Sequence, residues 1–141
     1  MFEQSIVMRA FILLIAILIG LASAVRAADD VAAAQAMIRA QDEAISRDDA
    51  AAAFSYAAPA IKGLFAQAEV FMAIVRQGYA PLYKPRSFEF GDAKTTDGNI
   101  AQLVFITDAE GVAWEALYLI EKQPDGSLKI NGCTLKKATR A

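Results

Sequence analysis

The sequence predicts an α+β domain in which N-terminal helices pack on a bent, four-stranded antiparallel sheet. Two observations support this prediction. Between residues 29 and 78, apolar side chains recur at the three- and four-residue spacing that is typical of one helix face. From Arg86 onward they alternate with a period of two, as they do in strands. Helices and strands therefore occupy separate halves of the chain, which is the arrangement of α+β domains.

The start of the chain has the pattern of a signal peptide, which we assign to residues 1–27. A short region ends in the positive charge of Arg9, and residues 10–24 then carry no charge. This apolar run is shorter than the roughly 20 residues of a membrane span, and small residues follow it. We expect cleavage near Ala27 and a periplasmic or secreted protein. A start at Met8 and an uncleaved segment that anchors the protein in a membrane are the alternatives.

The mature chain, residues 28–141, is expected to form a single domain that starts with helices. Residues 29–49 form the first helix, and Asp29 or Asp30 can cap it. Its apolar stripe consists of Val31, Ala34, Ile38 and Ile45. Gln41 falls on the same stripe, so its amide needs a partner inside the protein. Shorter helices are expected over residues 50–58, 59–65 and 68–77.

The segment Gly78–Gly91 joins the helices to the sheet. Gly78 is expected to end the last helix in the left-handed conformation that suits glycine. Pro81 favours extended backbone at the residue before it, Ala80, and a second proline does the same at Lys84. We therefore expect the segment to run extended into the first strand.

Four strands are expected in the second half of the chain. They cover residues 87–91, 100–108, 112–122 and 128–137, and Asp97-Gly98 is expected to form the turn between the first two. An antiparallel sheet with one wet face alternates apolar and polar residues. The third strand is instead apolar on both faces, with Tyr118 on one face and Leu117 and Leu119 on the other. The helices can cover one face, and we expect a second copy of the chain to cover the other in a homodimer.

Three segments resemble a family of exported bacterial proteins. They are IRAQDEAISRDDAAAAFSYAAPAIK at 38–62, GYAPLYKPRSFEFG at 78–91 and QPDGSLKINGC at 123–133. The family is known as domain of unknown function 4864, and the resemblance covers essentially the whole mature chain. Leu128 stands where that family commonly has a tryptophan, which exchanges one large apolar residue for another.

The order of helices and strands also resembles the nuclear-transport-factor-2-like fold. This is a cone-shaped α+β fold that ketosteroid isomerase and the polyketide cyclases share. In such folds the ligand cavity lies between the helices and the bent sheet. Both resemblances imply a fold, and neither implies an established activity.

The composition excludes several kinds of chemistry. The chain has no histidine and one cysteine, so it lacks histidine-based nucleophile pairs and the ligands of a zinc site. Glycine-rich phosphate loops and calcium loops are also absent, so we expect no cofactor and no metal. Basic residues do not cluster beyond Lys136 and Lys137, and the formal net charge is −2, so nucleic acid binding is not expected. Cys133 is expected to act as a small apolar residue.

The ionisable residues that are left allow an enzyme hypothesis, although none is assigned as catalytic. In ketosteroid isomerase an aspartate base works beside hydrogen-bond donors to an enolate oxygen. Asp42, Glu89 and Glu115 are the candidate carboxylates in this chain. Charged residues on helices and strands are mostly solvated. We therefore expect Asp42 on the solvent side of the first helix, beside Glu43, and Glu115 at the rim of the sheet.

A small ligand pocket is expected between the helices and the sheet. Tyrosine has an apolar ring and a polar tip, which suits a pocket wall with one wet end. We expect Gln41, Arg76, Tyr79, Tyr83 and Tyr118 near this pocket. A tyrosine hydroxyl is the expected partner of the Gln41 amide. The alternative is that Tyr79 and Tyr83 only pack on the end of the preceding helix.

Three functions are compatible with these observations. The favoured one is an exported, non-enzymatic domain that binds a small apolar or amphipathic ligand, or a protein partner, in the cell envelope. One alternative is an isomerase- or cyclase-type enzyme that uses a pocket carboxylate and tyrosines. The other is an interaction scaffold that acts through the outer face of the sheet. A cavity with an ionisable group at its base would favour the enzyme.

Overall fold

The computed structural model describes the backbone of residues 2–139 and the side chains of residues 8, 9, 12 and 15–139. The chain divides into two compact units, Met1–Asp30 and Val31–Ala141. Helix α1 (Phe2–Ser46) contributes residues to both units. Within the described residues, no helix contains an apolar stretch long enough to cross a membrane. The predicted signal peptide belongs to the first unit and stays a prediction.

The part of α1 in the second unit carries the predicted apolar stripe. Ala34 and Ile38 are fully buried, and Ile45 is nearly so. Gln41 is buried on the same stripe, as its position in the sequence indicates. Ile38 packs in one cluster with side chains of the sheet, so the stripe joins the helical half to the strands.

Helix α1 ends earlier than predicted. Its last residue is Ser46, whereas the sequence pattern continues to Asp49. Asp48 has a φ of 59°, a left-handed conformation that a right-handed helix does not accommodate. Asp49 then caps helix α2 (Ala50–Ser55), because its carboxylate accepts a hydrogen bond from the Ala52 amide at 3.1 Å.

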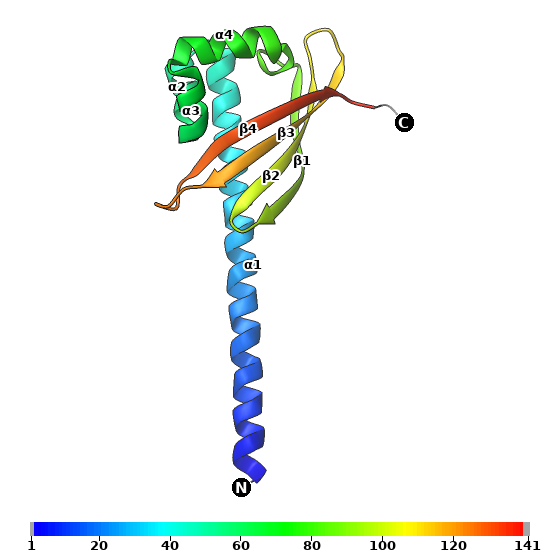
Figure 1. Cartoon of the computed structure of the whole chain (residues 1–141). Helices are drawn as coiled ribbons and strands as arrows, with labels where there is room; N and C mark the ends of the chain where they lie inside the picture. Colours follow the sequence, from blue (N-terminus) through cyan, green and yellow to red (C-terminus); the bar gives the residue numbers. More distant parts are fainter. Residues whose placement is uncertain (1, 140–141) are drawn as a thin grey trace. The chain divides into compact units, whose positions relative to one another are not determined.

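Two further helices follow close to their predicted positions. Helix α3 (Pro59–Phe65) has Pro59 in its first turn, where the missing amide hydrogen costs nothing. Helix α4 (Ala68–Gly78) packs against α2, and the Phe54 and Phe71 rings lie 5.4 Å apart between their centroids. Figure 1 shows α2, α3 and α4 grouped together beside the sheet.

The segment after α4 differs from the prediction. The helix ends at Gly78, but Gly78 is not among the described glycines with a positive φ. A 3₁₀ helix, η1 (Ala80–Leu82), replaces the extended backbone that was expected at its first residue. The Leu82 amide donates to the Tyr79 carbonyl at 2.8 Å, and Pro81 and Leu82 are both buried. Burial of these side chains therefore outweighs the preference of Ala80, the residue before a proline, for extended backbone.

The second half of the unit is the predicted antiparallel meander. Strands β1 (Ser87–Thr96), β2 (Asn99–Thr107), β3 (Ala113–Lys122) and β4 (Leu128–Lys137) pair in chain order (Figure 1). The predicted Asp97-Gly98 pair turns β1 into β2 with φ values of 52° and 80°. Two consecutive positive φ values are typical of the tight hairpin turn that matches strand twist. The fold class is α+β, as predicted.

Strand β1 is longer than predicted because it continues past a bulge. Its register with β2 shifts between Phe90 and Ala93. Gln102 of β2 is fully buried, and its amide nitrogen donates to the Gly91 carbonyl inside the bulge at 2.9 Å. Gln35 of α1 donates to the Gln102 side-chain oxygen at 3.1 Å. The buried Gln102 amide therefore satisfies a backbone group that the bulge leaves unpaired.

One face of the sheet is buried and the other is exposed. The buried face carries Val104, Ile106, Ala116, Tyr118 and Ile120. The opposite face carries Phe105, Leu117 and Leu119, which are 44%, 39% and 45% exposed. The helical half covers the first face (Figure 1), and no described residue of this unit covers the second face. The homodimer through that face stays a prediction.

Candidate functional site

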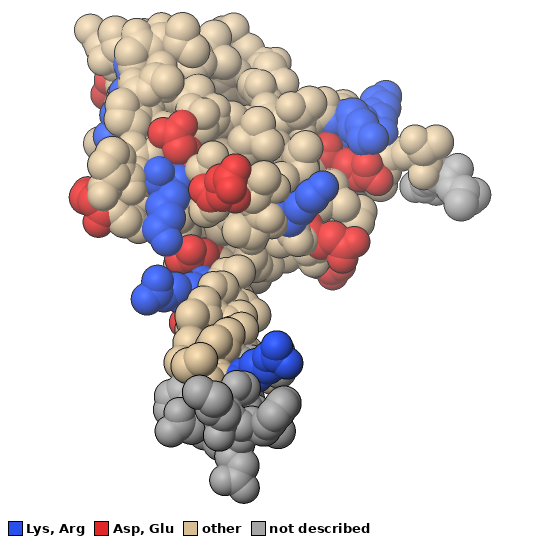
Figure 2. All heavy atoms as spheres, turned by 60° about the horizontal axis from the view of Figure 1, so that its bottom comes forward, with Lys and Arg blue, Asp and Glu red and all other residues tan. Residues whose placement is uncertain are grey.

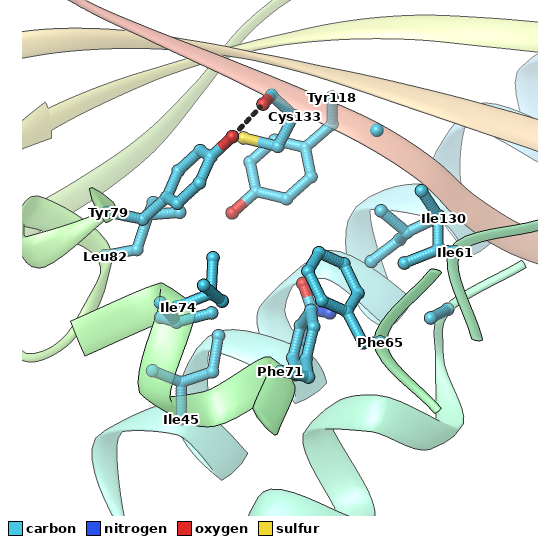
Figure 3. Close-up of a pocket in the computed structure, with 14 residues that line it drawn as sticks. Ile45, Ile61, Phe65, Phe71, Ile74, Tyr79, Leu82, Tyr118, Ile130 and Cys133 are labelled. Atoms are coloured by element: carbon cyan, nitrogen blue, oxygen red, sulfur yellow. Dashed lines mark hydrogen bonds between the residues drawn. The ribbon is translucent and has the colours of Figure 1, made fainter. Parts of the chain in front are cut away.

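A cavity of about 220 Å³ lies in the second unit, between the helices and the inner face of β3 and β4 (Figure 3). Side chains from α1, α3, α4, η1, β3 and β4 surround it. The apolar wall consists of Ile45, Ile61, Phe65, Phe71, Ile74, Val75, Leu82 and Ile130. The cavity therefore has the position that the sequence predicts for a ligand pocket.

Two phenylalanines shape the helical side of the cavity. The rings of Phe65 and Phe71 meet edge to face, with 5.9 Å between their centroids. Figure 3 shows both rings across the cavity from Tyr79. Ile74, one turn after Phe71 on α4, lines the cavity and is 40% exposed. The entrance therefore lies beside α4, and Tyr118, which is 2% exposed, lies at the deep end.

Tyr79 lines the cavity. Its hydroxyl donates to the Cys133 carbonyl oxygen at 3.2 Å, which Figure 3 marks with a dashed line. This bond joins the start of η1 to β4. Because the hydroxyl is engaged in this bond, Tyr79 contributes mainly its apolar ring to the cavity wall.

Gln41 also lines the cavity, but its partner is not a tyrosine. The Gln41 amide nitrogen donates to the Ala53 carbonyl at 3.2 Å. Helix α2 ends at Ser55, so Ala53 has no amide one turn ahead in the same helix to bond with its carbonyl. Gln41 supplies that missing donor, and the expectation of a tyrosine partner is wrong for this physical reason.

Tyr118 and Cys133 form the polar end of the cavity. The two residues are paired across β3 and β4, and both line the cavity. Burial raises the pKa of the Cys133 thiol to about 12 and holds the pKa of Tyr118 well above its usual value. Both groups are therefore neutral at physiological pH, and the thiol is a poor nucleophile.

Asp42 does not lie on the solvent side of α1, and that expectation is wrong. Its Oδ1 atom is buried with no hydrogen-bond partner among the described residues. Burial is the main cause that raises the pKa of Asp42 to about 6. The charge of Arg39 lowers this pKa, and the charge of Glu43 raises it by a smaller amount. The Asp42 charge also raises the pKa of Tyr118, so the two groups are electrostatic neighbours. Even so, Asp42 is not part of the cavity wall.

Arg76 and Tyr83 lie outside the cavity wall, on a cluster at the protein surface. The Tyr83 hydroxyl donates to both carboxylate oxygens of Asp48, at 2.8 and 2.9 Å. Arg76 donates to Asp48 Oδ1 at 2.6 Å, and its guanidinium lies 5.7 Å from the centre of the Tyr83 ring. These bonds lower the pKa of Asp48, with Arg76 as the largest cause. The cluster fixes the left-handed residue that ends α1, which is a structural role.

The other two candidate carboxylates also lie away from the cavity wall. Glu89 is exposed on β1, and Glu115 pairs with Lys136 across β3 and β4 at 3.3 Å. No group of acidic, cysteine or histidine side chains within the described residues could hold a metal ion. Neither carboxylate therefore belongs to the cavity.

Sequence reasoning missed most of the apolar wall. Phe65 and Phe71 lie on the apolar sides of predicted helices, and that spacing is the same for a packed core and for a cavity wall. Leu82 lies in the segment that was expected to be extended, where no helical spacing applies. A packed core and a cavity wall differ in how far apart α3, α4 and β4 lie, and a single sequence does not give that distance.

The surface shows no concentration of one charge on the side that Figure 2 presents. Acidic and basic side chains are interspersed there. Phosphate backbones are bound by clustered positive charge, so this face has no feature of a nucleic acid site.

Comparison with known proteins identifies a family. Residues 27–141 match a family model described as Domain of unknown function (DUF4864). No curated protein and no solved structure matches the chain. The predicted family resemblance is confirmed, and the nuclear-transport-factor-2-like fold stays a prediction.

Proposed function

This chain belongs to the family described as Domain of unknown function (DUF4864), and we propose that its second unit binds a small apolar or amphipathic molecule in the cavity. The observation that carries the proposal is the apolar wall around about 220 Å³ of space. Pockets for drug-sized ligands span about 300–1,000 Å³, whereas a dry cavity of about 150 Å³ admits benzene. The cavity therefore suits a molecule of one or two rings.

The energetic cost of the space supports a ligand. Apolar cavities destabilise a fold by about 24 cal/mol per Å³, so a closed, empty cavity of this volume would cost about 5 kcal/mol. Small domains are stable by only about 5–15 kcal/mol. The cavity opens beside Ile74, which makes this figure an upper bound, but a bound molecule would still restore many lost contacts.

Catalysis by an isomerase- or cyclase-type mechanism has less support. A general base needs to reach the reacting proton directly or through one water. No described residue on the cavity wall carries a charge, and Asp42 is not part of the wall. Binding without catalysis is therefore the function that the geometry favours.

The proposed setting is the cell envelope. It depends on the signal-peptide pattern of residues 1–27, and N-terminal sequencing of protein from a periplasmic fraction tests it. We expect the mature chain to begin at Ala28. Protein that begins at Met1 or Met8 and sediments with membranes contradicts cleavage.

Blocking the entrance tests the binding proposal. Ile74→Trp adds bulk at the entrance, and Val70→Trp places the same large side chain one turn earlier on α4, at an exposed residue outside the wall. The probe is p-xylene, followed by ligand-detected NMR. We expect the wild type and Val70→Trp to bind p-xylene and Ile74→Trp to bind at least about tenfold more weakly. Equal binding by both variants, or no binding to the wild type, contradicts the proposal.

A further inference from the structure

We propose that the cavity selects a neutral molecule with one hydroxyl or carbonyl group and rejects carboxylates of the same size and shape. This inference depends on the proposed function, because it names the ligand class of the same site. It rests on three features: an uncharged wall, a hydroxyl group at the deep end, and a buried carboxylate that acts electrostatically on that hydroxyl group.

The first feature is the absence of positive charge on the wall. Carboxylates in proteins are bound by arginine, lysine or several converging backbone amides. None of the described residues on the wall is arginine or lysine. Arg76 is held at the surface by Asp48, at 2.6 Å, and is not part of the wall. A carboxylate that entered would lose its hydration without gaining an ion pair.

The second feature is the hydroxyl of Tyr118. Figure 3 shows the Tyr118 ring projecting from β3 with its hydroxyl directed into the cavity. Its polar neighbour on the wall is Cys133, the residue paired with it on β4, and a thiol is a weak acceptor. By contrast, the Tyr79 hydroxyl and the Gln41 amide nitrogen already donate to backbone carbonyls. Tyr118 is therefore the donor best able to bond with a ligand oxygen.

The third feature is a buried carboxylate: Asp42 follows the wall residue Gln41 on α1, and its Oδ1 atom is buried. The Asp42 carboxylate acts electrostatically on Tyr118. Arg39 and Glu43 are the other charged groups that act on Asp42, and both lie on α1. The charge of Asp42 makes the deep end of the cavity unfavourable for a second anion. A neutral hydroxyl or carbonyl group incurs no such repulsion.

Three probes of matched shape test the inference on the full-length protein at pH 8. They are p-xylene, which is apolar, 4-methylbenzyl alcohol, which is neutral and polar, and 4-methylbenzoate, which is anionic. Their binding is measured by ligand-detected NMR in the wild type, in Tyr118→Phe and in the control Tyr56→Phe. Tyr56 packs on the same core but is not part of the wall. Circular dichroism shows that each variant is folded.

We expect the alcohol to bind at least about 30-fold more tightly than the carboxylate. We also expect Tyr118→Phe to remove most of the advantage of the alcohol over p-xylene, and Tyr56→Phe to keep it. Equal binding of the alcohol and the carboxylate overturns the inference and leaves the proposed function standing. An unchanged preference in Tyr118→Phe overturns the role of the hydroxyl. Failure of all three probes to bind overturns the proposed function itself.

Discussion

Replacing Asp42 with asparagine should stabilise the protein at neutral pH. Asp42 has a buried oxygen without a hydrogen-bond partner, and burial raises the pKa of the carboxyl group to about 6. A pKa that is higher in the folded state than in the unfolded state means that the fold favours the protonated form. The contribution of Asp42 to stability is therefore fully present below pH 3.8 and is lost as the pH rises through about 6.

The size of the effect follows from the pKa. The pKa of Asp42 moves from 3.8 to about 6, a difference of about two units, and each unit corresponds to about 1.4 kcal/mol. The upper limit is thus about 3 kcal/mol. Asp42 is partly accessible to solvent, and screening reduces the effect to about 1–2 kcal/mol.

Urea unfolding of the wild type and of Asp42→Asn between pH 4 and pH 8 measures this quantity. We expect Asp42→Asn to be more stable than the wild type by about 1–2 kcal/mol at pH 8 and to differ little at pH 4, where the carboxyl group is neutral. Glu89→Gln removes an exposed charge on β1 that does not act on Asp42 and is the control, which should change little. A wild type whose stability does not fall between pH 4 and pH 7, or an asparagine variant that is less stable at pH 8, refutes the reasoning.

Three further predictions concern the cavity wall and the open face of the sheet. Gln41→Leu leaves the Ala53 carbonyl without its side-chain donor, so the free energy of unfolding in urea should fall by about 1–3 kcal/mol. The control, Gln77→Leu at an exposed position, should change it little, and equal effects of the two variants contradict the role of the bond. The Cys133 thiol should react with an aromatic disulfide reagent at pH 8 at least about tenfold more slowly in the folded protein than in urea, because burial raises the pKa of the thiol. Equal rates in the folded and unfolded protein contradict this prediction. Sedimentation at micromolar concentration should show a dimer, and Leu117→Lys should raise its dissociation constant at least about tenfold, because Leu117 lies on the exposed apolar face. A monomeric wild type contradicts the predicted homodimer.

The elements that the sequence predicts well are those determined by neighbours in the chain. The stripe that contains Ile38 requires only the helical period, and its burial is confirmed. The Asp97-Gly98 turn requires two residues that tolerate positive φ, and it is found where expected. The order of the strands follows from these short turns, because each strand pairs with the next.

The features that sequence reasoning missed depend on contacts between distant residues. Asp42 is one residue from buried Gln41 and one from exposed Glu43, so helical spacing alone does not decide its environment. Gln102 lies at a strand position where alternation predicts an apolar residue. It is buried because a bulge in the neighbouring strand presents the Gly91 carbonyl to it. Neither the environment of Asp42 nor the partner of Gln102 can be read from the local sequence pattern.

Tyr79 and Tyr83 illustrate how one turn decides which residues form the site. In an extended segment, both rings would follow the chain away from α4, and nothing in their spacing would distinguish them. The 3₁₀ turn of η1 instead separates them: the Tyr79 hydroxyl bonds to Cys133 at the cavity, and the Tyr83 hydroxyl bonds to Asp48 at the surface. The turn forms because Leu82 is buried against the core, which is a tertiary effect. The same segment therefore supplies one residue to the cavity wall and another to the structural cluster that ends α1.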